Sequence, residues 1–456
     1  MNQTLKRRFS FLAIGILGWT LVLCSQGSLF AAEPPETALS LKECLTRAVE
    51  YSPQLRSALL EQQRLRYQRM ETMSAGLPQV NANGSFDDYL SLPTSLIPGE
   101  FFGQPGKMIP VQFGTKYNLS ATVDASQLLY NQSYLTSLNL ARMMMDRNLL
   151  DMEKLREAVV FDVSGLYFQA QAVRVQKKNL SENIARLDTM VRIASFQHEN
   201  GLIKKIDLDR INVNRINLLT AMENLETVYQ QQLSILKYYM GMEQTAVIAI
   251  PEDLDDRYFS IEPSRSFEDH IDLRLIRQDK AMLDKNLELI RAGYIPSLAA
   301  YGRYNYSSQD NAFSFFCKDA EWYEMALVGV RLDIPIFDGL QKHSRTKQAR
   351  IQMQQLDIRE EETRKMIGIQ LQDAALRLKN SRDAWARQSE NVRLAENVFN
   401  VTKEQYNQGL VAVTEVLLAQ MDLGEAQVGY VKALVQMKNA ELEYMRANGT
   451  ILTILN

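Results

Sequence analysis

The sequence predicts a mainly α-helical protein whose remaining regular structure is a small β-sheet of the transmembrane-barrel type. Three observations support this fold class. The 456 residues include only 21 Gly and 12 Pro, which is below the usual share of both helix-breaking residues. One stretch carries an apolar residue at every seventh position over nine repeats, as long coiled-coil-like helices do. Two other stretches alternate apolar and polar residues, which is typical of strands.

Composition excludes several classes of function. The 51 Lys and Arg against 54 Asp and Glu give a net charge of −3, so the chain lacks the basic surface of a nucleic-acid-binding protein. The three Cys and three His are far apart and show no metal-ligand or disulfide spacing. No nucleophile, base and orienting group occur at a recognisable catalytic spacing, and the GxxxxGK[ST] nucleotide motif is absent. We expect that the protein is not an enzyme and that it binds neither a cofactor nor a metal ion.

Residues 1–32 are predicted to be a signal peptide. Basic residues at 6–8 precede a 15-residue apolar run at 9–23, which fits a secretory signal and is too short for a transmembrane helix. A retained N-terminal anchor is the alternative, although no stop-transfer pattern follows. Cys24 offers a second alternative, lipidation, but Leu23 is larger than the residue usual before a lipoprotein cysteine. No apolar stretch of 18 or more residues follows, so the mature chain could cross a membrane only as strands.

The rest of the chain is predicted to be a duplicated unit. The Ala-Gly segment that ends at Pro78 recurs before Pro296, and Gly201-Leu202 recurs as Gly409-Leu410. The first repeat is predicted at 33–240 and the second at 266–449, separated by a linker at 241–265 and followed by a tail at 450–456. Each repeat should contain a helix, a β-hairpin, a long helix, a tip turn and a returning helix. The hairpin region is longer in the first repeat, so it should contain an inserted loop.

The two β-hairpins are expected at about 79–128 and about 297–335. In the first, Leu119, Ala121 and Val123 alternate with Ser120, Thr122 and Asp124. A half-buried sheet of a soluble protein alternates in the same way. However, nearly all of the remaining sequence is predicted to be long helix, so little structure is available to pack on the apolar face of these strands. The pattern therefore favours lipid on one face and water on the other. Pro78 and Pro296 should mark the transitions from helix to strand, because proline lacks a backbone N–H.

The long helices are predicted from a heptad pattern. Between residues 131 and 200 one heptad position is apolar throughout, and a second run begins at Leu371. The first run comprises Leu138, Met145, Met152, Val159, Leu166, Val173, Leu180, Leu187 and Ala194. About 70 residues at about 1.5 Å per residue make a rod of about 100 Å.

Four strands per chain cannot close a barrel, because edges exposed to lipid leave backbone groups unpaired at a cost of several kcal/mol each. The chain should therefore oligomerise. Two copies would supply about eight strands and three copies about twelve, and both numbers are allowed. The polar strand faces favour the larger barrel with a water-filled interior.

The sequence resembles the TolC-like outer-membrane efflux protein family from about Leu39 to Gly449. The resemblance rests on the order and spacing of several segments, which are Leu41-Lys42-Glu43-Cys44-Leu45, Ser52-Pro53-Gln54-Leu55, the segments ending at Pro78 and Pro296, Pro335-Ile336-Phe337-Asp338-Gly339, Gly201-Leu202 to Asp207-Leu208, and Tyr406 to Leu417. It implies a homotrimer whose twelve strands form one barrel in outer-membrane lipid and whose helices form a barrel through the periplasm of a Gram-negative cell.

The resemblance also implies a function and partners. The chain would be the passive exit duct of a tripartite efflux or type I secretion system, gated at its periplasmic tips. A periplasmic adaptor (membrane fusion) protein and an inner-membrane pump would be its partners. A periplasmic or secreted structural coiled coil without channel activity is the alternative, but it leaves the duplicated hairpins unexplained.

The resemblance places a gate at the helical tips, with Tyr406, Asp207 and Glu415 in its network. The position that holds arginine in family members is Val411 here, and a second acidic position is Leu418. Our hypothesis is that Glu415, repeated by threefold symmetry, forms a ring that favours cations. The alternative is that Asp207 and Glu415 only complement helix N-termini.

The tip turns supply the remaining candidate residues. Lys204 or Lys205 could replace the missing arginine as the cation of the gate. A glycine that ends each long helix allows the left-handed turn before the next helix begins. The turns Gly201-Leu202 and Gly409-Leu410 are therefore expected at the tips, where the resemblance implies docking of the adaptor.

Overall fold

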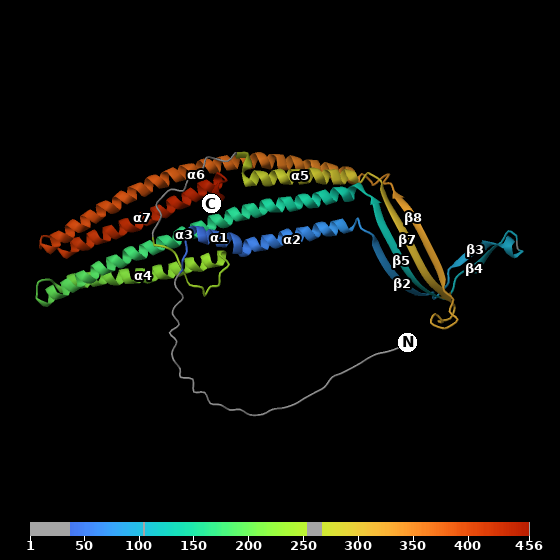
Figure 1. Cartoon of the computed structure of the whole chain (residues 1–456), viewed down its shortest axis with the longest axis horizontal. Coiled ribbons are helices and arrows are strands. Elements are labelled where there is room, and N and C mark those ends of the chain that lie inside the picture. The colour runs from blue at the N-terminus through green and yellow to red at the C-terminus, as the bar shows by residue number, and fades with distance from the viewer. Residues whose placement is uncertain (1–36, 104, 253–266, 456) are drawn as a thin grey trace, which may run out of the picture.

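The computed structural model describes residues 37–103, 105–252 and 267–455. The predicted signal peptide, with Cys24, lies outside these residues, as do residues 253–265 of the predicted linker. The molecule is elongated, with a sheet at one end and two helical hairpins ending together at the other (Figure 1). The mainly helical fold class with a small sheet is confirmed.

Long helices make up most of the described chain. They are α1 (Leu41–Tyr51), α2 (Pro53–Ser74), α3 (Gln132–Glu199), α4 (Lys205–Tyr239), α5 (Ile271–Ala292), α6 (Gln341–Asn407) and α7 (Val413–Ala447). Helices α3 and α6 contain 68 and 67 residues, so each is a rod of about 100 Å. The helix predicted before the β-hairpin of the first repeat is interrupted at Ser52. This residue precedes Pro53 and has an extended backbone, because residues before proline avoid the helical region.

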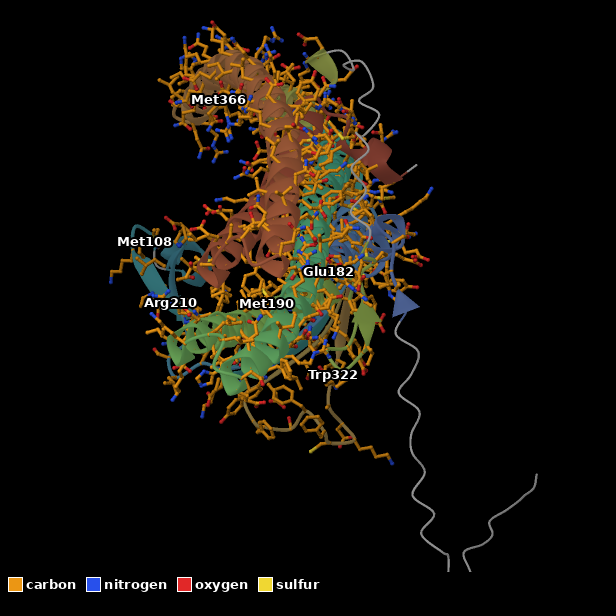
Figure 2. All side chains as sticks on the ribbon, turned by 90° about the vertical axis from the view of Figure 1, so that its left-hand side faces the viewer. Met108, Glu182, Met190, Arg210, Trp322 and Met366 are labelled. Carbon is orange, nitrogen blue, oxygen red and sulfur yellow. The ribbon has the colours of Figure 1, made fainter. Side chains whose placement is uncertain are left out.

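The helices pack as one curved layer. Helix α3 lies between α2 and α5 near the sheet and between α4 and α7 near the tips, and α6 packs on α5 and α7. Viewed from the tips, the layer runs in an arc from α6, which carries Met366, to α4, which carries Arg210 (Figure 2). None of the described helices combines the length and the apolar composition that a membrane-spanning helix requires.

The main sheet consists of β2 (Gln79–Asp88), β5 (Tyr117–Tyr130), β7 (Ser297–Asp310) and β8 (Tyr323–Asp333), in the order β2-β5-β7-β8. All three pairings are antiparallel. The central pair, β5 and β7, joins the two halves of the chain, with Ala125 opposite Gly302. Strands β2 and β8 are the edges, and each has one side without a strand partner among the described residues.

A second hairpin interrupts the connection between β2 and β5. It pairs β3 (Thr94–Pro98) with β4 (Met108–Gln112) around the short helix η1 (Gly99–Phe102) and projects beyond the sheet (Figure 1). At its base the ring of Phe86 lies 6.0 Å from that of Tyr117 and 5.6 Å from that of Phe313, centroid to centroid. The sequence predicted an insertion here but not its strands.

The helices meet the strands at tight connections. Pro78 lies between the end of α2 and the first residue of β2, and Pro296 lies between α5 and β7. The hydroxyl of Tyr134, in the first turn of α3, donates to the carbonyl of Met73 at 3.1 Å. This bond fixes the start of α3 against the end of α2.

The largest buried cluster lies near the middle of the molecule. It joins α1, α3, α4 and the C-terminal turn η3 (Ile451–Leu455), beside the two-stranded parallel pair β1 (Thr37–Ala38) and β6 (Ile248–Ala249). Ser40 and Glu43 form a reciprocal capping box at the start of α1. Burial raises the pKa of the Cys44 thiol to about 12, so this cysteine is a packing residue and not a nucleophile.

Candidate functional site: the helical tips

The first tip turn connects α3 to α4 through Gly201 and Leu202. The backbone N–H of Gly201 donates to His198 and that of Leu202 donates to Gln197, at 2.9 and 2.8 Å. This pair of bonds is the Schellman motif, which ends a helix by way of a left-handed residue. Gly201 has a φ of 74°, a left-handed conformation that glycine adopts without steric strain because it has no Cβ.

The second tip turn, between α6 and α7, repeats the first. Gly409 donates to Tyr406 and Leu410 donates to Gln405, both at 2.9 Å, and Gly409 has φ of 75°. The side chains of Leu202 and Leu410 are 72% and 70% exposed. Each tip therefore presents one apolar side chain to solvent at the same position of the same motif.

Tyr406 joins the two tips. Its hydroxyl donates a hydrogen bond to Oε1 of Gln197 at 3.1 Å, and its ring contacts the buried clusters on both sides of α7. Partial burial and the negative charge of Asp207 raise the pKa of Tyr406. The structure thus brings Tyr406 near Asp207, and the hydrogen bond of the Tyr406 hydroxyl goes to Gln197.

Gln197 was not singled out from the sequence. It lies three residues after Ala194, the last member of the apolar heptad run, and residues three apart share one face of a helix. Its position on the packed face of α3 was the signal that could have identified it.

Asp207 and Glu415 occupy equivalent positions. Each is the third residue of its helix, α4 or α7, and neither helix has a side-chain cap at Lys204 or Ala412. Asp207 is half-buried and Glu415 is exposed. Both carboxylates lie where the positive end of a helix dipole stabilises negative charge.

Lys204 and Lys205 are both exposed. In the part of the chain that the structure describes, neither lysine forms an ion pair with Asp207 or Glu415 within one protomer. Near the first tip, an ion pair between Arg215 of α4 and Asp188 of α3 connects these two helices. The described residues also contain no group of three His, Cys, Asp or Glu that could hold a metal ion.

The outer membrane efflux protein family model matches residues 44–238 and 263–450. The chain belongs to this family. It is 23% identical over 319 residues to the outer membrane protein TolC of Vibrio cholerae, which covers 68% of each chain. The resemblance seen in the sequence is therefore confirmed, and this efflux protein is a transport protein of the outer membrane rather than an enzyme.

Solved structures agree with this fold. The efflux protein superposes on CusC with a TM-score of 0.71 at 17% identity, covering 90% of this chain and 91% of the other. It superposes on the CmeC outer membrane channel of Campylobacter jejuni with a TM-score of 0.67 at 15% identity, covering 90% and 85%. For the open-state MtrE outer membrane channel of Neisseria gonorrhoeae the values are 0.65 and 17%, with coverage of 90% and 89%.

In this efflux protein a buried polar ladder holds the two helical hairpins together above the tips. Asn183 of α3 is only 5% exposed. Its side-chain oxygen accepts from Gln420 at 2.9 Å and its amide donates to Gln427 at 3.1 Å, both on α7. Because buried amides are costly when unpaired, this ladder fixes the register of α3 against α7. Sequence analysis missed it.

Proposed function

We propose that this efflux protein is a homotrimeric exit duct of a tripartite efflux or type I secretion system. The observation that carries the proposal is the four-stranded sheet, whose edge strands β2 and β8 each have one side without a strand partner in the described part of the chain. Successive strands run in opposite directions, so an even number leaves edges that can pair antiparallel with the next copy. In a bilayer such edges must be paired, and three copies would form one barrel of about twelve strands with a polar interior.

The helical part of the proposed trimer forms the periplasmic tunnel. The curved layer of α4, α3, α7 and α6 (Figure 2) would supply one third of a helical barrel. Three such layers enclose a passage far longer than the thickness of a bilayer, about 30 Å. The duplicated unit, with its repeats at 33–240 and 266–449 around the linker, accounts for the matching tips at Gly201 and Gly409.

The tips are the proposed gate and docking surface. Tyr406, Asp207 and Glu415 would close the periplasmic end, with Lys204 or Lys205 as cations contributed between copies. A periplasmic adaptor would dock on Gly201-Leu202 and Gly409-Leu410, where the two exposed leucines offer equivalent apolar contacts. The chain has no nucleotide-binding motif, so an inner-membrane pump would supply the energy and the duct itself would be passive.

Fractionation and cross-linking test the proposal. The full-length protein is expressed with its signal peptide, the outer membrane is isolated, and the purified protein is cross-linked and measured by native mass spectrometry. We expect outer-membrane protein of trimeric mass that conducts ions in planar bilayers. A monomer in the soluble fraction without conductance would instead favour the structural coiled coil.

A further inference from the structure

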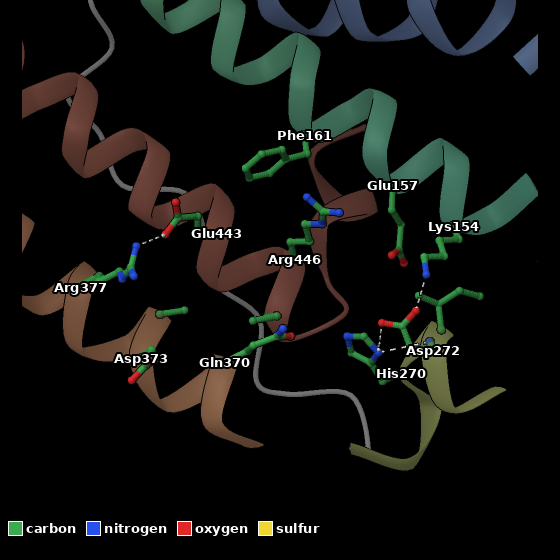
Figure 3. Close-up of a pocket in the computed structure, with 13 residues that line it drawn as sticks. Lys154, Glu157, Phe161, His270, Asp272, Gln370, Asp373, Arg377, Glu443 and Arg446 are labelled. Carbon is green, nitrogen blue, oxygen red and sulfur yellow. Dashed lines mark hydrogen bonds and ion pairs between the residues drawn. The ribbon is translucent and has the colours of Figure 1, made fainter. Parts of the chain in front are cut away.

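A pocket lies where α7 ends and α5 begins, in the middle of the molecule. Helices α3 and α6 form its other two walls, and its volume is about 530 Å³. Figure 3 shows charged side chains from all four helices around it. The pocket is far along α3 and α6 from the tips and from the strands, and the proposed gate does not use it.

Glu157 of α3 is the unusual group in this pocket. Its side chain points into the pocket (Figure 3) although the residue is only 8% exposed. None of the described residues donates a hydrogen bond to its carboxylate or forms an ion pair with it. Burial, and then the negative charges of Glu153 and Asp272, raise the pKa of Glu157 to about 7. A carboxylate that is largely removed from water and has no direct ion pair is costly, so a cation bound beside it would stabilise it.

The basic groups around the pocket already have partners. Lys154 pairs with Asp272 at 2.7 Å, and Arg377 pairs with Glu443 at 3.8 Å. The guanidinium of Arg446 lies over the ring of Phe161, 4.9 Å from its centroid, which is a cation–π contact. Arg446 and Arg274 lower the pKa of Glu157 by less than burial raises it. Neither forms a direct ion pair with Glu157 among the described residues, so Glu157 is the charge at the buried end of the pocket that lacks one.

We propose that this pocket binds an organic cation that carries a primary ammonium group, with the carboxylate of Glu157 as its counter-ion. A metal ion fits less well, because no three His, Cys, Asp or Glu within the described ranges are placed to share one. The volume admits a small organic molecule, and Phe161, Ile271 and Ala374 supply apolar surface for its carbon chain. Such an ion pair would be strengthened by its removal from water.

Protons compete with the cation for Glu157. Binding should weaken by about tenfold between pH 8 and pH 6, since the carboxylate is the ligand and its pKa lies between these values. His270 is protonated less in this range than an ordinary histidine, because burial lowers its pKa. The charged groups that surround Glu157 are Glu153 and Lys154 on α3, Asp272 and Arg274 with His270 at the start of α5, Asp373 and Arg377 on α6, and Glu443 and Arg446 on α7.

The experiment titrates the full-length protein in lipid nanodiscs with n-butylammonium and follows binding by saturation-transfer NMR. Neutral butan-1-ol and Mg²⁺ are titrated in parallel. We expect n-butylammonium to bind at pH 8, to bind about tenfold more weakly at pH 6, and to bind at least tenfold more weakly to Glu157→Gln at pH 8. Glu182→Gln, on the same helix outside the pocket, serves as the matched control and should bind as the unmodified protein does.

Three outcomes would overturn the proposal. These are equal binding of n-butylammonium to Glu157→Gln, equal affinity for butan-1-ol, and tighter Glu157-dependent binding of Mg²⁺. A thermal melt of Glu157→Gln establishes that the variant is folded, and glutamine is close in shape to the protonated acid. The binding measurement does not depend on ion flow through the duct. A failure of n-butylammonium to bind would therefore not contradict the proposed duct. A lack of conductance would likewise not contradict the binding result.

Discussion

The hydroxyl of Tyr406 and the side-chain oxygen of Gln197 are 3.1 Å apart, although the two residues are 209 positions apart in the sequence. Tyr406 lies in the last turn of α6 and Gln197 in the last turn of α3, so this hydrogen bond ties the two helical hairpins together at their tips. Both helices end in the same Schellman turn within a few residues of the bond. Any separation of the hairpins at the tips must break it.

Replacing Tyr406 with Phe should favour the open tip. The substitution keeps the ring in its apolar clusters but removes the donor to Gln197, and a hydrogen bond of this kind contributes about 1 kcal/mol. We expect longer open times in single-channel recordings of the purified protein in planar bilayers. The overall melting temperature should change little, since the packing of the ring is retained.

A double-mutant cycle with Gln197→Ala provides the control. If the bond couples the tips, Tyr406→Phe should add little to the effect of Gln197→Ala. Full additivity of the two changes would mean that the bond does not hold the tips together.

Gly409→Ala should destabilise the second tip. Gly409 has φ of 75°, and a side chain in this left-handed region costs about 1–2 kcal/mol. No atom lies within 4 Å of the position a Cβ would take, so the cost comes from the backbone alone. Hydrogen exchange at the last turn of α6 should therefore accelerate about fivefold to thirtyfold in Gly409→Ala, and Gly201→Ala should do the same for the last turn of α3.

Gly368→Ala is the matched control for this prediction. Gly368 lies inside α6, also with nothing within 4 Å of the Cβ position, and alanine in a helix interior is favoured over glycine by about 1 kcal/mol. Protection should rise in this variant. Faster exchange in Gly368→Ala as well would show that added side chains, and not the left-handed turn, cause the loss.

The sequence predicted the features that depend on local pattern. The heptad run that ends at Ala194 marks the packed face of α3, and the alternation around Val123 marks β5, because each follows the period of its element. The strands β3 and β4 were not predicted because each is only five residues long and because Pro98 and Pro110 interrupt their alternation. Prolines are tolerated at the ends and edges of such strands.

The buried polar residues could not be predicted in the same way. Asn183 and Glu157 are ordinary polar residues within a helical pattern, and nothing local distinguishes them from solvent-exposed ones. What buries them is the approach of α7 to α3, a contact between segments about 240 residues apart in the case of Asn183 and Gln420. Such positions follow from tertiary packing, which a single sequence does not specify.

Glu415→Gln tests the proposed cation-favouring ring at the tip. If three copies of Glu415 surround the constriction, removing their charge should lower the preference for K⁺ over Cl⁻, which is measured as a shift of the reversal potential in a salt gradient. Asp207→Asn is the matched variant, because Asp207 occupies the same position of α4 but is half-buried. It should change selectivity less.

The helix-dipole alternative predicts a different pattern. Both acids would then only stabilise the first turns of α4 and α7, so both variants would weaken their helices slightly. Unchanged ion selectivity in Glu415→Gln would contradict the proposed ring and favour the helix-dipole interpretation.

Glu157→Gln should stabilise the protein at high pH and not at low pH. The pKa of Glu157 is about 7 in the folded chain, against 4.5 as its ordinary value. Below pH 4.5 the acid is protonated in both states and burial costs little. As the pH rises from 4.5 to 7, the unfolded chain ionises first, so the folded state loses stability, by as much as about 3 kcal/mol above pH 7.

Glutamine carries no charge and should escape this loss. The melting temperature of Glu157→Gln should therefore equal that of the unmodified protein near pH 4.5 and exceed it at pH 8, when both are measured without added amines. Glu182→Gln, whose carboxylate is half exposed and 3.8 Å from Arg186, should show no such gain at pH 8. If Glu157→Gln melted lower than the unmodified protein at pH 8, the carboxylate would have to be stabilised in the folded chain, and neither the raised pKa nor the missing counter-ion could be correct.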